Sequence, residues 1–496
     1  MIGAGVFAAF GPAARAAGTG LLIGLAVAAV IAYCNATASA QLAAAYPTSG
    51  GTYVYGREQL GHWWGFAAGW GFVIGKTASC AAMALTFATH VIPGPWWAQR
   101  LLAVAGVLGL AALNCRGVTR TVALTRVLVV CTLLALTVIV VGIASGIASG
   151  IADAAPLGGW AALGTGGVYG VLQAAGLLFF AFAGYARIAT MGEEVRDPRR
   201  TIPRAIPLAL GITVLVYALV GGAALLAAGP DRLAGAAAPL TEAVHASGAG
   251  ALAPVVRVGA ALASLGALLA LIAGVGRTGL AMARQRDLPR WLAAVHPRYR
   301  VPHHAETALA VVVSVLVLTA DLRSVIGFSS FGVLVYYLIA NLSAASQPAE
   351  QRRWPRPLNL LGCVGCVTLA ATLPPESVVT GLLMFAIGLV GRLLVLLRRE
   401  RSARRRVGAA GADQDQPAED HGEESDHHGH GAADHPVAGA GSTVGDGQVQ
   451  RAADHGDQPR HQRNGGPPSP AVADGTDGAG KSRPADDRAD DPQQGG

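Results

Sequence analysis

Charged side chains are scarce in this sequence. Only 14% of its 496 residues are charged, whereas 52% are hydrophobic, and the mean hydropathy is +0.44. Soluble globular chains do not have this balance, so the scarcity of charge excludes a soluble globular protein. What the chain has instead is a series of apolar runs of about 20 residues, the length that crosses a bilayer.

Acidic groups are missing from the interior of these runs, and lysine is nearly missing from the whole chain. The only lysines are Lys76 and Lys481, and arginine carries almost all of the net charge of +7. The arginines lie in short loops between the apolar runs. This placement favours a membrane protein over a nucleic-acid-binding one.

Residues that make catalytic or metal sites are also missing from the apolar runs. No Ser/His/Asp set, histidine cluster or pair of carboxylates lies within any of them, so an enzyme is the least expected class and no cofactor is expected. Cys363 and Cys366 have a redox or zinc spacing but no nearby His or Cys partner, so we interpret them as small apolar filler. The start of the chain lacks a positive region, so no cleavable signal peptide is expected.

The apolar runs predict an all-α integral membrane protein with about twelve transmembrane helices. The twelve segments are residues 1–13, 18–45, 64–91, 96–114, 122–146, 166–191, 203–228, 250–283, 303–320, 324–345, 357–373 and 377–397. Most arginines lie in alternate loops, and the other loops hold only Arg15, Arg100, Arg232 and Arg323. By the positive-inside rule, this asymmetry predicts an even number of spans with both termini in the cytoplasm.

The two ends of the chain differ from its middle. We expect a transmembrane domain at 1–397 and a cytoplasmic tail at 398–496, which is rich in Gly, Asp and His and is predicted to be disordered because it has almost no large apolar groups. The histidines near 426–430 are interpreted as part of this solvated tail and not as a metal site. A helix over 1–13 would reach only about 20 Å of a core of about 30 Å. Either half a helix enters the membrane or translation starts upstream of Met1, and we expect the second.

Glycine interrupts two of the twelve segments. Gly3 and Gly5 flank Ala4 in the first, and Gly184 lies in a break at 181–185 in the sixth. The two segments lie five spans apart, and this odd offset inverts one half of the chain relative to the other. Paired broken segments in inverted halves are typical of a transporter site near the bilayer midplane, and exposed N–H groups after the first break suit a carboxylate. The alternative is that these glycines serve only close helix packing.

Four motifs follow one another along residues 1–397. They are Ile2-Gly3-Ala4-Gly5-Val6-Phe7; Tyr46-Pro47 with Gly50-Gly51 and Tyr53; Phe180-Ala181-Phe182-Ala183-Gly184-Tyr185 followed by Glu193-Glu194, Pro198 and Ile202-Pro203; and Ala283-Arg284 with Asp287-Leu288-Pro289. Together they resemble the amino acid–polyamine–organocation permeases. The resemblance implies a five-plus-five inverted repeat of the leucine-transporter type, with broken helices 1 and 6 and two further C-terminal spans.

The resemblance also implies a substrate site. It assigns the substrate's α-carboxylate to the first motif, at Ile2, Gly3, Ala4 and Gly5. It assigns the amino group and side chain to the break of span 6, with backbone carbonyls at Ala181 and Ala183 on either side of Phe182 and next to Gly184. Phe180 would cover the substrate as an aromatic lid, or would only pack in the core.

Ionisable residues within spans are functional candidates by default. Lys76 in span 3 could take up and release a proton, because burial disfavours its charged form. Arg126 in span 5 falls where some proton-coupled members of the family carry a lysine, so it is a second coupling candidate, as a fixed positive charge. The alternatives are a structural hydrogen bond for Lys76 and snorkelling to the interface for Arg126.

Two carboxylates follow span 6. Glu193 and Glu194 end a helix at its negative dipole end, which is unfavourable unless cations lie nearby. The arginines at 196, 199, 284 and 286 could supply them, so Glu193 and Glu194 are candidates for a cytoplasmic gate. The alternative is solvated carboxylates held by local arginines.

The sequence therefore predicts a secondary active amino acid permease of the plasma membrane that is coupled to protons. A neutral or acidic substrate is expected, because embedded cations would repel a cationic one. The alternatives are a non-transporting amino acid sensor of the same fold, or a permease for polyamines or cationic amino acids. A major-facilitator transporter would need an Asp-Arg-Gly-Arg-like motif after span 2, where this sequence has Tyr46-Pro47-Thr48-Ser49-Gly50-Gly51.

Overall fold

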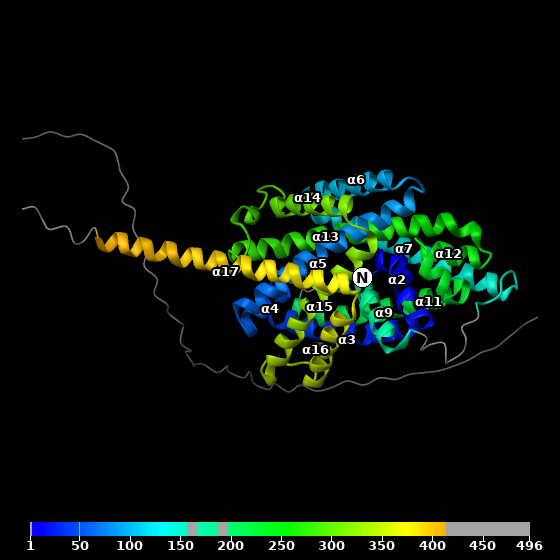
Figure 1. The fold of residues 1–496 in the computed structure, drawn as a ribbon, viewed down its shortest axis with the longest axis horizontal. Coiled ribbons are helices and arrows are strands. Elements are labelled where there is room, and N and C mark those ends of the chain that lie inside the picture. The colour runs from blue at the N-terminus through cyan, green and yellow to red at the C-terminus, as the bar shows by residue number, and fades with distance from the viewer. Residues whose placement is uncertain (1, 49, 117, 156–165, 186–196, 413–496) are drawn as a thin grey trace, which may run out of the picture. The chain divides into compact units, whose positions relative to one another are not determined.

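The computed structural model describes residues 2–48, 50–116, 118–155, 166–185 and 197–412 (Figure 1). Every secondary-structure element in these residues is helical. The main helices are α1 (Gly5–Ala8), α2 (Phe10–Ala17), α3 (Leu21–Ala45), α4 (Thr52–Leu60), α5 (His62–Val91), α6 (Trp96–Asn114), α7 (Val118–Ala148), α9 (Gly167–Phe182), α11 (Pro198–Gly235), α12 (Pro239–Ala246), α13 (Ala253–Arg284), α14 (His303–Thr319), α15 (Leu322–Ser346), α16 (Arg356–Thr372) and α17 (Pro375–Ala412).

Length and hydropathy make this a helical membrane protein with many spans. Within the described residues, eight helical stretches are long and apolar enough to cross a membrane, and α9, α14 and α16 are shorter apolar helices. The expected all-α membrane class is thus confirmed, while the count of twelve spans and the inverted repeat stay predictions. Helix α17 continues to Ala412, past residue 397, where the sequence placed the end of the last span. The extension at 398–412 is rich in Arg and Ala, which are good helix formers.

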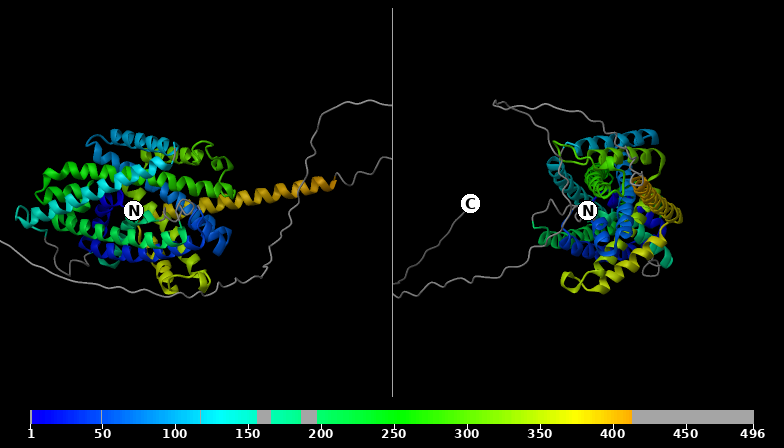
Figure 2. Two further views of the ribbon diagram at one scale, coloured as in Figure 1. Left: turned by 180° about the vertical axis from the view of Figure 1, so that it is seen from behind. Right: turned by 90° about the vertical axis from the view of Figure 1, so that its left-hand side faces the viewer.

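Helix α5 is the interior helix of the bundle. In its most apolar stretch 89% of the residues are buried in protein, against 17% in α6 and 11% in α17. It packs against α13 and α15, whereas α3 packs against α9 and α11. Figures 1 and 2 show α6 and α14 along one side of the bundle and α16 along the opposite side. The outer helices present exposed Leu and Val side chains, which is the pattern expected of a lipid-facing surface.

The chain near its start packs closely against two distant helices. A Cβ added to Gly5 would lie 2.5 Å from Cβ of Ala181 in α9, and one added to Gly3 would lie 2.7 Å from Cβ of Ala267 in α13. Real Cβ atoms do not approach one another this closely, so only glycine fits at both positions. The packing role considered for these glycines is therefore real, and it brings span 1 against spans 6 and 8.

Helix α9 ends inside the protein. Its last residue is Phe182, and a single 3-10 turn, η2 (Ala183–Tyr185), follows it. Residues 178–183 are all buried. The carbonyl groups of the last helical turn have no partner within the helix, so they need donors from elsewhere. Glu193 and Glu194 lie outside the described residues.

We expect Gly5→Ala to lower the free energy of unfolding by about 1–3 kcal/mol, because the new methyl group meets the backbone and Cβ of Ala181, which cannot move aside. Thermal unfolding of the purified protein, followed by intrinsic fluorescence, measures this change. The matched control is Gly211→Ala in α11, where no atom lies within 4 Å of the added Cβ. Equal melting temperatures for the two variants would contradict the close approach.

Candidate functional site

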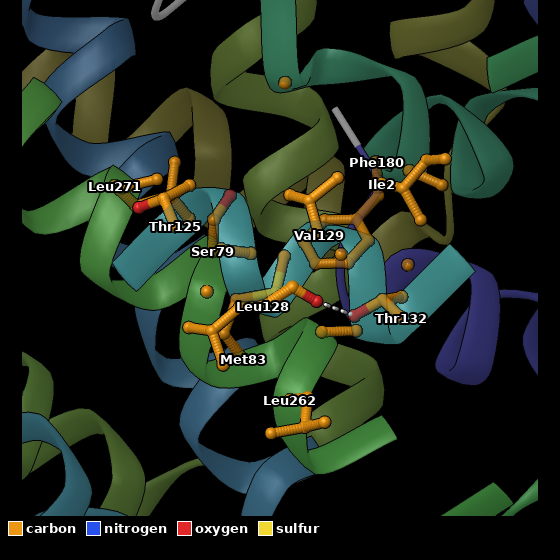
Figure 3. A pocket seen from close by; sticks show the side chains of 18 of the residues that line it. Ile2, Ser79, Met83, Thr125, Leu128, Val129, Thr132, Phe180, Leu262 and Leu271 are labelled. Atoms are coloured by element: carbon orange, nitrogen blue, oxygen red, sulfur yellow. Dashed lines mark hydrogen bonds between the residues drawn. The ribbon is translucent and has the colours of Figure 1, made fainter. Parts of the chain in front are cut away.

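A cavity of about 190 Å³ lies where five segments of the chain converge (Figure 3). The segments are the residues around α1, helices α5, α7 and α13, and the end of α9. The lining is mostly apolar, with hydroxyl groups from α5 and α7 and one lysine. The lining residues are Ile2, Gly3, Gly5, Lys76, Ser79, Met83, Thr125, Leu128, Val129, Thr132, Phe180, Ala181, Gly184, Leu262, Ala263, Gly266, Ala267, Ala270 and Leu271.

Most residues of the expected substrate site meet at this one cavity. Both glycine-interrupted segments contribute to its lining, although they are separated by about 175 positions in the sequence. Ala4 and Ala183 are buried beside it without being part of the lining. The residues of the expected site that do line it are Ile2, Gly3, Gly5, Phe180, Ala181 and Gly184.

Side chains from two other helices bind the carbonyl groups at the end of α9. The hydroxyl of Tyr217, in α11, donates a hydrogen bond of 2.9 Å to the carbonyl of Ala181. The Nζ atom of Lys76, in α5, donates one of 2.9 Å to the carbonyl of Ala183. These are the two carbonyls that the resemblance assigned to a substrate's amino group. Each carbonyl oxygen has a second lone pair, so it can accept another donor where charge repulsion with the first donor allows it.

Lys76 is the only ionisable side chain in the described lining of the cavity. It is 3% exposed. Nearby, the hydroxyls of Ser79 and Ser329 lie 2.6 Å apart and bond to each other. The structural hydrogen bond considered for Lys76 exists, and its acceptor is the break of span 6. A charge at the break of a membrane helix can still have a functional role.

Arg126 is placed differently from Lys76. Its neighbours Thr125 and Leu128 line the cavity, but Arg126 itself is exposed and is absent from the lining. An exposed arginine on an outer helix fits the snorkelling alternative. The structure therefore separates the two coupling candidates.

A second polar site lies at the arginine-rich end of the bundle, and we call it the Asp287 cluster (Tyr53, Arg57, Asp287 and Arg392). Tyr53 donates a hydrogen bond of 2.8 Å to Oδ2 of Asp287, and Nη1 of Arg57 lies 3.2 Å from the same oxygen. Nη2 of Arg392 lies 3.1 Å from Oδ1. Burial and the Asp287 carboxylate raise the pKa of Tyr53, so its hydroxyl stays a donor. The cluster joins α4, α17 and the turn after α13.

Arg392 is enclosed on several sides. Its guanidinium carbon lies 4.6 Å from the ring centroid of Phe66 and 4.8 Å from that of Trp63, and Nη1 donates a hydrogen bond of 2.8 Å to the carbonyl of His62. Its side chain and that of Asp287 are each 8% exposed. A charge pair buried to this extent is held by geometry and is costly to break, unlike a surface pair.

Three buried polar side chains, Tyr217, Arg392 and Glu306, were not predicted from the sequence. Tyr217 could have been noticed as a lone hydroxyl in an apolar span, since a buried tyrosine usually finds an acceptor. Arg392 falls inside the segment expected as the last span, 377–397, and nothing in the sequence shows its partner. Glu306, in the first turn of α14, is 2% exposed and accepts a long contact of 3.5 Å from Sγ of Cys115. The acid lies near the end of an apolar segment, so the sequence did not indicate its burial.

Several known proteins are similar to this chain in sequence. An uncharacterized transporter of Mycobacterium tuberculosis is 59% identical over 405 residues, which cover 81% of this chain and 90% of that protein. The branched-chain amino acid permease BcaP of Bacillus subtilis is 23% identical over 79% of this chain and 88% of its own length. The chloroplastic cationic amino acid transporter 7 of Arabidopsis thaliana is 28% identical over 69% of this chain and 62% of its own length.

The family model described as amino acid permease matches residues 1–393, which include every helix that lines the cavity. This match and the 59% identical relative together cover most of the described helices. The chain therefore belongs to the amino acid permease family.

Proposed function

We propose that this protein is a secondary active transporter that moves an amino acid across the plasma membrane by alternating access, coupled to protons. The observation that carries the proposal is the cavity of about 190 Å³ where both glycine-interrupted segments and Lys76 meet. Broken membrane helices that converge on a cavity are typical of transporter sites, and a lysine there is a candidate proton carrier.

The proposed site has one end for each charge of an amino acid. Near Gly3 and Gly5 the helix starts, and the first N–H groups of any helix lack acceptors within it, so they suit the carboxylate. At the other end, the carbonyls of Ala181 and Ala183 at the negative end of α9 suit the ammonium. Phe180 lines the cavity and would cover the substrate.

The proposed substrate is a neutral amino acid with an apolar side chain. The cavity wall carries large apolar side chains and, among the described residues, no carboxylate that could pair with a cationic side chain. Lys76 would repel such a side chain. The relative named as a branched-chain permease supports this class, whereas the one named as a cationic amino acid transporter points to the alternative class. The apolar residues concerned are Met83, Leu128, Val129, Phe180, Leu262 and Leu271.

The proposed architecture is a five-plus-five inverted repeat of twelve spans, with both termini and the arginine-rich loops in the cytoplasm. In this orientation the Asp287 cluster lies on the cytoplasmic side. It ties α4 and α17 to the end of α13, which is one of the helices that line the cavity. We infer that the cluster acts as a cytoplasmic gate that must separate when the substrate leaves. Glu193 and Glu194 remain gate candidates beyond the described residues.

The purified protein in proteoliposomes should take up L-leucine or another neutral amino acid in a saturable manner under a proton gradient. An excess of L-arginine or putrescine should not compete, because the cavity offers no anion to a second cation. Uptake of radiolabelled amino acids from a panel of all twenty measures this, with protein-free liposomes as the control. Binding without uptake would select the sensor alternative, and competition by L-arginine would select a cationic substrate.

Asp287→Asn should weaken the proposed gate, because it leaves the buried Arg392 without its anion. We expect a loss of about 3 kcal/mol in the free energy of unfolding and a marked loss of uptake. Thermal unfolding and uptake measure the two effects. The control is Asp197→Asn, since Asp197 forms an exposed pair with Arg200 at 3.8 Å and such pairs contribute about 0–1 kcal/mol. Similar effects of the two substitutions would argue against a special role for Asp287.

A further inference from the structure

The carbonyl of Ala183, beside the cavity, could accept a hydrogen bond from either of two cations. The carbonyl of Ala183 follows the last residue of α9 and carries the negative end of that helix dipole. It accepts the Nζ atom of Lys76 at 2.9 Å. It is also a carbonyl that suits the ammonium of a bound amino acid in the proposed function, on which this inference rests. The protein thus supplies from α5 the same chemical group that the substrate would bring.

Two ammonium groups at the Ala183 carbonyl would lie close together. Both Lys76 and Gly184, the residue after Ala183, line the cavity, and Nζ of Lys76 lies 2.9 Å from the Ala183 carbonyl oxygen. A substrate ammonium bound to the same oxygen would therefore lie close to Nζ of Lys76. Two like charges at short range in a site of low dielectric repel each other strongly, and the repulsion favours loss of a proton from one of the two ammonium groups. Lys76 is buried in the protein at 3% exposure, and burial already disfavours its charged form, so the proton leaves from Lys76.

No described anion in the cavity would offset this repulsion. The polar side chains of the lining are the hydroxyls of Ser79, Thr125 and Thr132, and the neighbouring carbonyl of Ala181 accepts Tyr217. The Cys80 thiol lies one turn along α5 from Lys76 and is buried. The charged groups of the helices that pack on α5 are absent from the described lining of the cavity. They are Arg57 and Glu58 of α4, Arg100 of α6, Arg257, Arg277 and Arg284 of α13, Glu306 of α14, Arg323 of α15, and Glu376, Arg392, Arg398, Arg399, Glu400 and Arg401 of α17.

We propose that the substrate's ammonium and the protonated Lys76 compete for the Ala183 carbonyl, so that the protein exchanges an amino acid for a proton. When the amino acid enters, its ammonium takes the carbonyl, and Lys76 gives its proton to water on the side of entry. When the amino acid leaves on the other side, Lys76 takes a proton from water there and returns to the carbonyl. One cycle moves one amino acid in one direction and one proton in the other.

The pH dependence of binding follows from this competition. A proton on Lys76 opposes the substrate, so affinity must rise with pH over the range in which Lys76 titrates. In that range the apparent Kd should fall by up to about tenfold per pH unit, and about one proton should be released for each amino acid bound. Above that range the affinity becomes constant. A symporter would show the opposite sign, with tighter binding at low pH.

The test uses the full chain and the amino acid that gives the strongest uptake in the twenty-member panel, with L-leucine first. Calorimetry in buffers of different ionisation enthalpy counts the protons released on binding. In proteoliposomes, uptake should be faster with an acidic lumen than with an acidic exterior. Proton uptake on binding, or faster uptake with an acidic exterior, would overturn the exchange and leave the proposed function standing. Absence of uptake for every amino acid under both gradients would overturn the proposed function itself.

Substitutions at position 76 separate titration from hydrogen bonding. Lys76→Gln keeps a donor for the Ala183 carbonyl but cannot titrate, so its Kd should be independent of pH and its proton release zero. Lys76→Arg keeps a fixed cation and should bind the amino acid weakly at every pH. Tyr217→Phe removes the donor at the neighbouring carbonyl without changing charge, and it should keep the proton release of the unaltered protein. Proton release that persists in Lys76→Gln would refute the inference, and the proton count of the unaltered protein decides it even if a variant does not fold.

Discussion

The structure depends on the carbonyl groups that are left free where α9 ends inside the protein. A backbone carbonyl in a low-dielectric interior needs a donor, and a membrane offers no water to provide one. Tyr217 of α11 and Lys76 of α5 meet this need at the carbonyls of Ala181 and Ala183. Two hydrogen bonds therefore join three helices at the point where the cavity forms.

The close approach of the first segment complements these hydrogen bonds. Gly5 allows the backbone near α1 to contact Ala181, so the start of one helix and the end of another border the same small space. In the proposed site, the first segment would offer N–H groups and the end of α9 would offer carbonyl groups to one ligand. This polarity matches the two charges of an amino acid, which agrees with membership of the amino acid permease family.

The two kinds of cationic side chain lie in different parts of the protein. Lysine occurs once in the apolar segments, where it lines the cavity, while most arginines lie in the loops between these segments. The carboxylate of Asp287 holds Arg57 and Arg392 and accepts a hydrogen bond from Tyr53. The cavity therefore has Lys76, whose ammonium group can lose its proton, and the Asp287 cluster has Arg57 and Arg392, whose guanidinium groups keep their charge. In the proposed function, this division would let proton coupling and gating use different residues.

Hydropathy and motif order alone determined the helical membrane class, the family resemblance and the two glycine-interrupted segments, because these properties depend on local composition and on the cost of placing polar groups in lipid. The lining of the cavity by both segments, which motif order anticipated, became a geometric fact only in the fold. Tertiary structure alone decided that Lys76 bonds to Ala183, that Arg126 faces outward, and that Arg392 pairs with Asp287. Those choices depend on helix rotation and on partners more than 100 residues away, and the hydropathy of a segment carries no information about either.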